Sequence, residues 1–155
     1  MSRYEASWQS VLHQGVSSRE QVDALLSRVP HATVFNTPEW CQAAAQALRA
    51  DQTLVTLTVR DGDTLVAWLP LVSATERVHG IAAATLRLLG YPFNDRAALL
   101  MLPGDAILAD MIMDTLSTCP QHWDLLVLSE LYDGQERSLV SDRARGAIEW
   151  RPCSR

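Results

Sequence analysis

The chain has 155 residues and a mass of 17.2 kDa, which is about the length of one domain. Hydrophobic residues make up 48% of it and charged residues 20%, so disorder is excluded as a description of the whole chain. The net charge of −5 argues against a nucleic-acid-binding surface as the main function. All 13 basic residues are Arg, which excludes lysine nucleophiles, Schiff bases and phosphate-binding lysines.

The chain contains no signal for membrane insertion, secretion or metal binding. Its apolar runs, such as residues 97–103, are too short to span a membrane, and the first 25 residues lack an apolar h-region. Cys41, Cys119 and Cys153 have no pairing pattern, which suits a reducing cytoplasm. Cys41 has apolar neighbours on a predicted helix, so we expect a buried, inert thiol. The four histidines lack metal-ligand spacing, and we expect no metal site.

Two helices are predicted first. Ser18 and Gln21 fit a capping box, and the apolar residues that follow have helical spacing as far as Pro30. Thr37 then stands at an N-cap position and Pro38 at the first helical position of a second helix.

A β-hairpin is predicted after the helices. Residues 53–59 are rich in β-branched side chains, an Asp-Gly pair signals a turn, and a second strand runs over 65–72. The second strand is apolar on both faces, which predicts a central strand. Pro70 is expected to end its regular pairing or to mark a bulge, and the polar residues 73–80 are expected to form a loop.

The second half of the chain alternates between the two kinds of element. Residues 82–89 fit either a helix or a strand, and 91–96 are predicted to form a turn. A short strand at 97–102 precedes a helix capped by Asp105. A long strand is predicted at 123–131, followed by a further helix and a last strand.

This order of elements predicts the fold class. Hairpins join the early strands and helical crossovers join the late ones, so the sheet is mixed and mostly antiparallel. We therefore expect a single domain over residues 1–155, of the α/β or α+β class, with helices flanking a central sheet.

Four short phrases narrow the fold class further. In chain order they are VFNTPEW at 34–40, LVAWLPL at 65–71, LRLLG at 86–90 and WDLLVL at 123–128. With the element order, they resemble the GNAT acyltransferases of the FemAB/CelD-like group. The resemblance extends over nearly the whole chain and implies a three-layer GNAT-like domain.

The same resemblance implies a function. Members of the group resemble two GNAT-like halves in tandem, and this chain resembles the first half. The implied reaction moves an acyl group from acyl-CoA, such as acetyl-CoA, to an amine or hydroxyl in polysaccharide or cell-envelope biosynthesis. The second half usually carries the acetyltransferase signature, so we expect a cytoplasmic protein that needs a C-terminal GNAT half or a homodimer partner. The alternatives are a stand-alone N-acetyltransferase and a non-catalytic interaction module.

An acyl-CoA site in this fold needs a glycine-rich loop before a helix N-terminus, where backbone N–H groups bind the pyrophosphate. Arg77, Gly80 and Ala82 match the family pattern for this loop. The expected place, however, is the step into the helix at Asp105, where Pro103 lacks an N–H and the Asp105 carboxylate repels phosphate. We expect a degenerate site and a plain surface loop at the match, unless the ambiguous segment after it is a helix.

Two polar groups are candidates for chemistry. Glu130 and Tyr132 lie at the end of a predicted central strand, where acid–base groups often stand; the plainer interpretation is that the strand leaves the core there. Asn94, Asp95 and Arg96 are candidates for contact with substrate or with the partner half; the plainer interpretation is an Asx-type turn.

The five tryptophans suggest either a sugar-stacking surface or core packing. Trp40, Trp68 and Trp123 fall on predicted apolar faces, so we expect them in the core. Trp8 and Trp150 are left as candidate interface residues.

Overall fold

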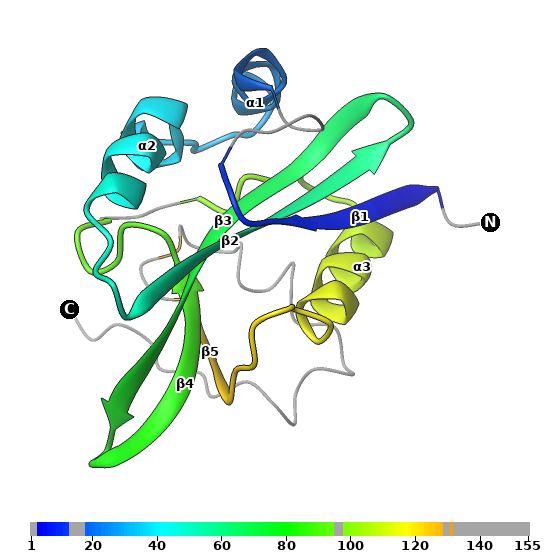
Figure 1. The fold of residues 1–155 in the computed structure, drawn as a ribbon. Helices are drawn as coiled ribbons and strands as arrows, with labels where there is room; N and C mark the ends of the chain where they lie inside the picture. Colours follow the sequence, from blue (N-terminus) through cyan, green and yellow to red (C-terminus); the bar gives the residue numbers. More distant parts are fainter. Residues whose placement is uncertain (1–2, 13–17, 95–97, 129–130, 132–155) are drawn as a thin grey trace.

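The computed structural model describes residues 3–12, 18–94, 98–128 and 131. A sheet of five strands, in the order β1-β2-β3-β4-β5, forms its centre (Figure 1). Successive strands are antiparallel except β4 and β5, which are parallel. The α+β class with a mixed sheet is therefore confirmed.

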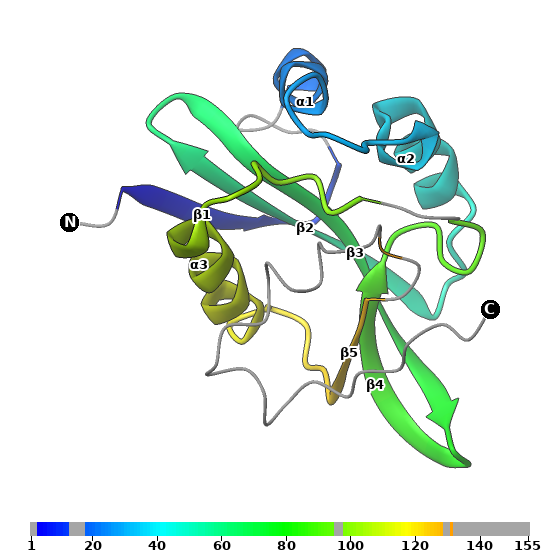
Figure 2. The ribbon, with the colours of Figure 1, turned by 180° about the vertical axis from the view of Figure 1, so that it is seen from behind.

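Helices pack on both faces of this sheet. The elements in chain order are β1 (Tyr4–Gln9), α1 (Arg19–Leu26), the 3-10 turn η1 (Val34–Asn36), α2 (Pro38–Gln46), β2 (Gln52–Asp61), β3 (Thr64–Val78), β4 (Ile81–Leu88), α3 (Ala106–Leu116) and β5 (Leu125–Val127). α1 and α2 cover one face, and α3 lies against the other (Figures 1 and 2). Because side chains alternate along β3, Leu69 and Leu71 join the core beneath α3, whereas Trp68 and Val72 join the core beneath α1 and α2.

The predicted helix starts are confirmed. Ser18 and Gln21 form both hydrogen bonds of a capping box before α1. The Thr37 hydroxyl caps α2, with Pro38 in its first turn. Asp105 caps α3. Each cap satisfies N–H groups that have no partner within the helix, which is why these signals could be identified in the sequence.

β1 is a strand that was not predicted from the sequence. It pairs along its length with β2, from Tyr4 opposite Asp61 to Gln9 opposite Thr56. The buried Tyr4 ring anchors it in the core beneath α3, with the partly buried Ala6 beside it. Tyr4, Ala6 and Trp8 face this core and alternate with polar residues, so the period-2 pattern of a half-buried strand was present in the sequence and could have predicted β1.

β3 is longer than predicted. The prediction of a loop at 73–80 was wrong, because β3 continues to Val78 and the turn is confined to the residues around Gly80. The ambiguous segment at 82–89 is resolved as the strand β4. Pairing with β4 supplies the partner that keeps the polar end of β3 extended, and local sequence does not report such pairing.

Pro70 does not end β3 and does not mark a bulge. The irregularity in the pairing of β2 with β3 lies instead between Val59 and Arg60 of β2. Before Pro70, the outer edge of β3 bonds to the segment 98–102, where Trp68 N–H donates to Leu100 O at 2.8 Å. After Pro70, the same edge pairs with β4. Pro70 therefore stands where the edge changes partner, and its missing N–H leaves no ladder bond unmade.

Two predictions for later strands are only partly met. The described part of the strand predicted at 97–102, residues 98–102, forms one bridge, from Met101 to Ala67 of β3. Of the strand predicted at 123–131, β5 is the regular part within the described residues. The last predicted helix and strand lie outside the described residues.

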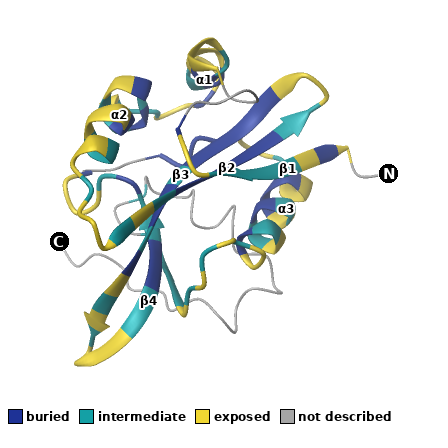
Figure 3. Cartoon of the chain, in the orientation of Figure 1, coloured by how far each residue is buried: buried dark blue, intermediate teal, exposed yellow. Residues whose placement is uncertain are grey.

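Burial is concentrated where β2 and β3 pass between the helices, whereas the far end of the β3–β4 hairpin is exposed (Figure 3). Among the described residues, no helix combines the length and the apolar composition that crossing a membrane requires.

Candidate functional site

A narrow pocket opens where β3 changes partner. The segment 98–102 borders it on one side and β4 on the other, and η1 and α2 lie over it. It is lined by Phe35, Asn36, Cys41, Trp68, Leu69, Pro70, Leu88, Leu89, Asn94, Ala98 and Leu100. Its empty volume is about 330 Å³ with the open mouth included, and its enclosed part has room for only about one or two water molecules.

Asn36 pairs with the backbone of Ala98 as a neighbouring strand would. Its Nδ2 donates to Ala98 O at 2.6 Å, and its Oδ1 accepts from Ala98 N at 3.2 Å. The same Oδ1 accepts from Thr33 N at 3.1 Å, within the capping box of η1. One buried side chain thus connects two segments 62 residues apart.

Asn94 fixes the loop after β4 to α2. Its Nδ2 donates to Leu89 O at 2.7 Å, and its Oδ1 accepts from the Trp40 indole Nε1 at 3.0 Å. Asn94 is 6% exposed, so both bonds are shielded from water. Of the residues predicted for substrate or partner contact, Asn94 is the one that the structure places in the pocket. Asp95 and Arg96 lie outside the described residues.

The described residues of the pocket lining are uncharged at neutral pH, since none of them is Asp, Glu, Arg, Lys or His. The Cys41 thiol is buried, as predicted, and burial raises its pKa to about 12. The thiol is therefore protonated at neutral pH, and the polar groups that the pocket offers are neutral.

The backbone conformation at position 90 and the close Asn94 side chain both require a glycine there. Gly90 has a φ of +93°, and a Cβ there would overlap Asn94 Oδ1 and lie 3.0 Å from Asn94 Cγ. Gly80 is a natural control, because it has a φ of +84° and a Cβ there would meet nothing within 4 Å.

We expect Gly90→Ala to destabilise the protein by about 1–3 kcal/mol more than Gly80→Ala. Both variants carry the backbone strain of a positive φ, but only the first displaces Asn94 and breaks its buried hydrogen bonds. Urea unfolding of the two variants measures the difference. Equal losses of stability would mean that Asn94 can move aside without cost.

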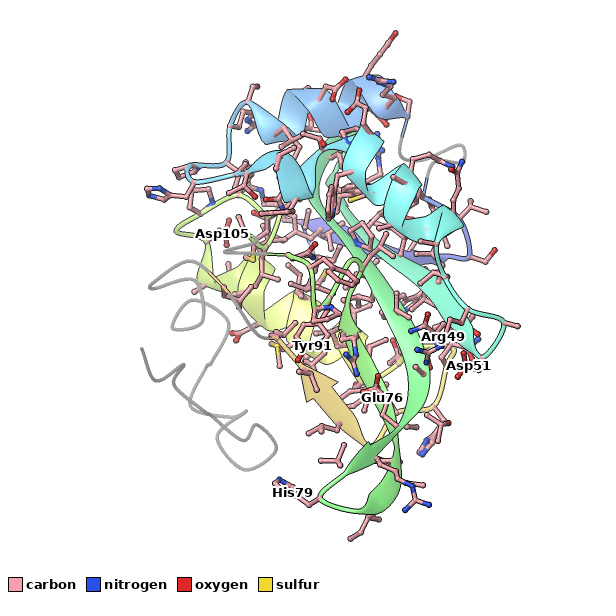
Figure 4. All side chains as sticks on the ribbon, turned by 90° about the vertical axis from the view of Figure 1, so that its left-hand side faces the viewer. Arg49, Asp51, Glu76, His79, Tyr91 and Asp105 are labelled. Carbon is pink, nitrogen blue, oxygen red and sulfur yellow. The ribbon has the colours of Figure 1, made fainter. Side chains whose placement is uncertain are left out.

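The residues predicted to bind a cofactor lie together, but far from the pocket. Arg77 and Ala82 are opposite each other in the β3–β4 hairpin, and Arg77 Nη1 donates to Gly80 O at 3.1 Å. His79 marks the exposed tip of this hairpin in Figure 4. A strand follows the turn, not a helix, so no helix N-terminus stands behind these residues.

The N-terminus of α3 is occupied by its own cap. Asp105 Oδ1 accepts from Ile107 N at 3.0 Å and from Leu108 N at 3.1 Å. The Tyr4 hydroxyl donates to the same carboxylate. Tyr4 and the two backbone N–H groups hold the pKa of Asp105 below its usual value. A negative charge therefore already occupies the position where a pyrophosphate would need N–H donors.

Sequence reasoning missed a charged group on β3 and β4. The Arg87 guanidinium forms an ion pair with Glu76, and its Cζ lies 4.5 Å from the centre of the Tyr91 ring (Glu76 and Tyr91 are labelled in Figure 4). Burial lowers the pKa of Arg87, and the nearby charge of Arg49 lowers it further. The ion pair and the ring contact tie the loop after β4 to the hairpin, and only the strand register brings these residues together.

Of the other candidates, Glu130 and Tyr132 lie outside the described residues, so their predicted acid–base role stays a prediction. The described residues contain no group of three or more His, Cys, Asp and Glu side chains that could hold a metal ion.

The four tryptophans among the described residues are divided between the two cores on opposite faces of the sheet. Trp68 is 1% exposed and belongs to the core, as predicted. Trp40 and Trp123 are half-buried; Trp123 precedes β5 and donates to Leu116 O at 3.0 Å. Trp8, predicted as an interface residue, packs partly buried against the core beneath α3, and Trp150 lies outside the described residues.

Comparisons of the chain with family models, with curated proteins and with solved structures found no match.

Proposed function

We propose that this chain is the N-terminal, GNAT-like half of a FemAB/CelD-type acyltransferase. In this role it shapes the acceptor cleft and supports a catalytic half that binds acyl-CoA. The order of elements carries the proposal. Two helices precede the antiparallel strands β2, β3 and β4, and α3 then crosses over to β5, which lies parallel to β4. From α1 to β5 this is the predicted order, except that the strand predicted at 97–102 is represented by the bridge from Met101 to Ala67; β1 was not predicted.

The positions of the resembling phrases support the same proposal. VFNTPEW forms η1 and the start of α2, and LVAWLPL lies in β3. LRLLG covers the end of β4 and the following turn, and WDLLVL leads into β5. Each phrase thus falls on an element that helps to build the core or the pocket.

The proposed role is non-catalytic because the described residues offer poor means of binding a nucleotide. The α3 N-terminus is capped by Asp105, and the Arg77–Gly80 turn precedes a strand. Acyl transfer also needs a base for the acceptor and N–H donors for the developing oxyanion. The described residues of the pocket lining supply donors but no charged base.

We expect calorimetric titration of the folded chain with acetyl-CoA to show no binding tighter than about 100 μM, which corresponds to about −5.5 kcal/mol. The chain co-expressed with a second GNAT-like half, where one is encoded next to it, is expected to bind acetyl-CoA and to transfer the acyl group.

Tight binding by the chain alone would contradict the proposed role and favour a stand-alone N-acetyltransferase. Arg77→Ala would then test the hairpin turn, because the stand-alone hypothesis assigns the pyrophosphate to it. A catalytic half with equal activity with and without this chain would contradict the supporting role.

Exposed apolar side chains favour a second candidate function, a non-catalytic interaction module. Phe93 is 77% exposed, Ile81 72% and Val34 61%. Apolar groups that remain exposed often mark interfaces. Stable expression of the chain, with neither acetyl-CoA binding nor a cognate catalytic half, would favour this function.

A further inference from the structure

The Asp105 carboxylate joins the start of α3 to the start of β1 (Asp105 is labelled in Figure 4). Its Oδ1 accepts from Ile107 N at 3.0 Å and from Leu108 N at 3.1 Å, which caps α3. Its Oδ2 accepts from the hydroxyl of Tyr4, the first residue of β1. Donors on both oxygens favour the ionised carboxylate over the protonated one. One charge therefore caps a helix and also holds a strand that lies 101 residues earlier in the chain.

Arg3 is the charged neighbour of this contact among the described residues. Its Nη1 lies 3.9 Å from Asp105 Oδ2, and its Nη2 lies 2.7 Å from Asp61 Oδ2 at the end of β2. Its Cζ lies 5.1 Å from the centre of the Tyr4 ring. The guanidinium stabilises the negative charges of Asp105 and Asp61, so an acid titration of this contact involves these two carboxylates.

β1 depends on this contact more than the rest of the sheet does. It is an edge strand of six residues, which pairs with β2 among the described residues. Tyr4 is its buried residue, at 6% exposed, and the other five are half-buried or exposed. Weakly buried edge elements open at free energies below that of global unfolding. β3, by contrast, pairs with a strand on each side and makes no contact with Asp105 that would hold it.

We propose that Asp105 is an acid-sensitive latch for β1. Protonation of its carboxyl removes the charge that Tyr4 and Arg3 contact, and β1 then opens from β2 and α3 while the rest of the sheet stays folded. The opening uncovers the edge of β2 that β1 covers along its whole length. The latch is a property of the fold and does not depend on acyl transfer.

The direction of the Asp105 shift sets the pH range of the opening. The bond from Tyr4, the two backbone N–H groups and Arg3 together lower the pKa of Asp105 in the folded chain. Its charge therefore stabilises the closed strand fully above about pH 4, the pKa of an unfolded Asp. This stabilisation is lost as the pH falls through the lower, folded-state pKa, by about tenfold in the opening equilibrium for each pH unit.

The test is native-state hydrogen exchange of the full chain, followed by NMR at about pH 6 and at about pH 3 and corrected for the intrinsic exchange rates. The amides of β1 report on the latch, and those of β3 report on the rest of the sheet. Asp105→Asn keeps a good N-cap but removes the charge. Tyr4→Phe keeps the buried ring but removes the hydroxyl. Asp61→Asn is the matched control, because it removes the other carboxylate beside Arg3 and leaves Asp105 in place.

We expect the protection of the β1 amides in the wild-type chain to fall about tenfold between the two pH values, with the β3 amides still protected at the lower one. In Asp105→Asn and in Tyr4→Phe the β1 amides should be about tenfold less protected already at about pH 6, with little further change in acid. Asp61→Asn should keep the acid response of the wild-type chain.

Unchanged protection of β1 in acid would overturn the proposal. An equal loss of protection from β1 and β3 would also overturn it, because it would show that acid unfolds the whole domain at once. A full acid response that persists in Asp105→Asn would assign the titration to another carboxyl. If Asp105→Asn does not fold, Tyr4→Phe decides the question, since it breaks the same contact from the other side without touching the cap of α3.

Discussion

Trp68→Ala is expected to lower the free energy of unfolding by about 4 kcal/mol. Trp68 is 1% exposed and is the largest fully buried side chain of β3, in the core beneath α1 and α2. Its indole N–H also donates to Leu12 O at 3.2 Å. The substitution leaves a large cavity in a layer that holds both helices to the sheet. Since domains are stable by only about 5–15 kcal/mol, the variant should be close to unfolding at 37 °C.

Urea unfolding, followed by circular dichroism, measures this loss. Trp68→Phe is the matched control. It keeps most of the ring and removes the bond to Leu12, so it should cost about 1–2 kcal/mol. A loss below about 1 kcal/mol for Trp68→Ala would mean that α1 and α2 do not depend on this face of β3.

Asn36→Ala is expected to cost about 3 kcal/mol. The substitution removes the partners of both Ala98 N–H and Ala98 C=O, which are buried groups without an alternative strand neighbour among the described residues. Each unsatisfied buried polar group costs about 1–3 kcal/mol, less where water enters. The indole N–H signal of Trp68 in an NMR spectrum of the ¹⁵N-labelled chain should shift as well, because Trp68 and Ala98 line the same pocket.

Two comparisons check the reason for this loss. Asn36→Asp keeps an acceptor for Ala98 N–H but removes the donor to Ala98 C=O, so it should also be destabilising. Val34→Ala, in the same 3-10 turn, removes a side chain that is 61% exposed and should change stability by less than about 0.5 kcal/mol. Similar losses for Val34→Ala and Asn36→Ala would show that the turn matters and the link to Ala98 does not.

Local sequence signals predicted those parts of the fold that short-range chemistry fixes. The caps at Ser18, Thr37 and Asp105 lie where predicted, because each satisfies N–H groups within its own first turn. The hairpin between β2 and β3 could also be predicted from the sequence, since an Asp-Gly pair favours the turn and β-branched residues favour the strands. The neutral state of Cys41 also followed from its apolar neighbours.

The tertiary structure decided whatever depends on partners distant in sequence. β1 exists because β2 offers it an edge, and β3 runs past Pro70 to Val78 because β4 pairs with its polar end. The pocket arises only where the partners of β3 change, at Pro70.

The pocket amides show the same division between sequence and structure. Sequence reasoning singled out Asn94 as a turn residue, but its bonds to Trp40 and Leu89 form only when α2 lies over the end of β4. Asn36 lies in the short turn η1, and its bonds to Ala98 cross 62 residues of chain. Caps and turns are encoded within a few residues, whereas the partner of a strand edge or a buried amide is chosen by the packing of the whole domain.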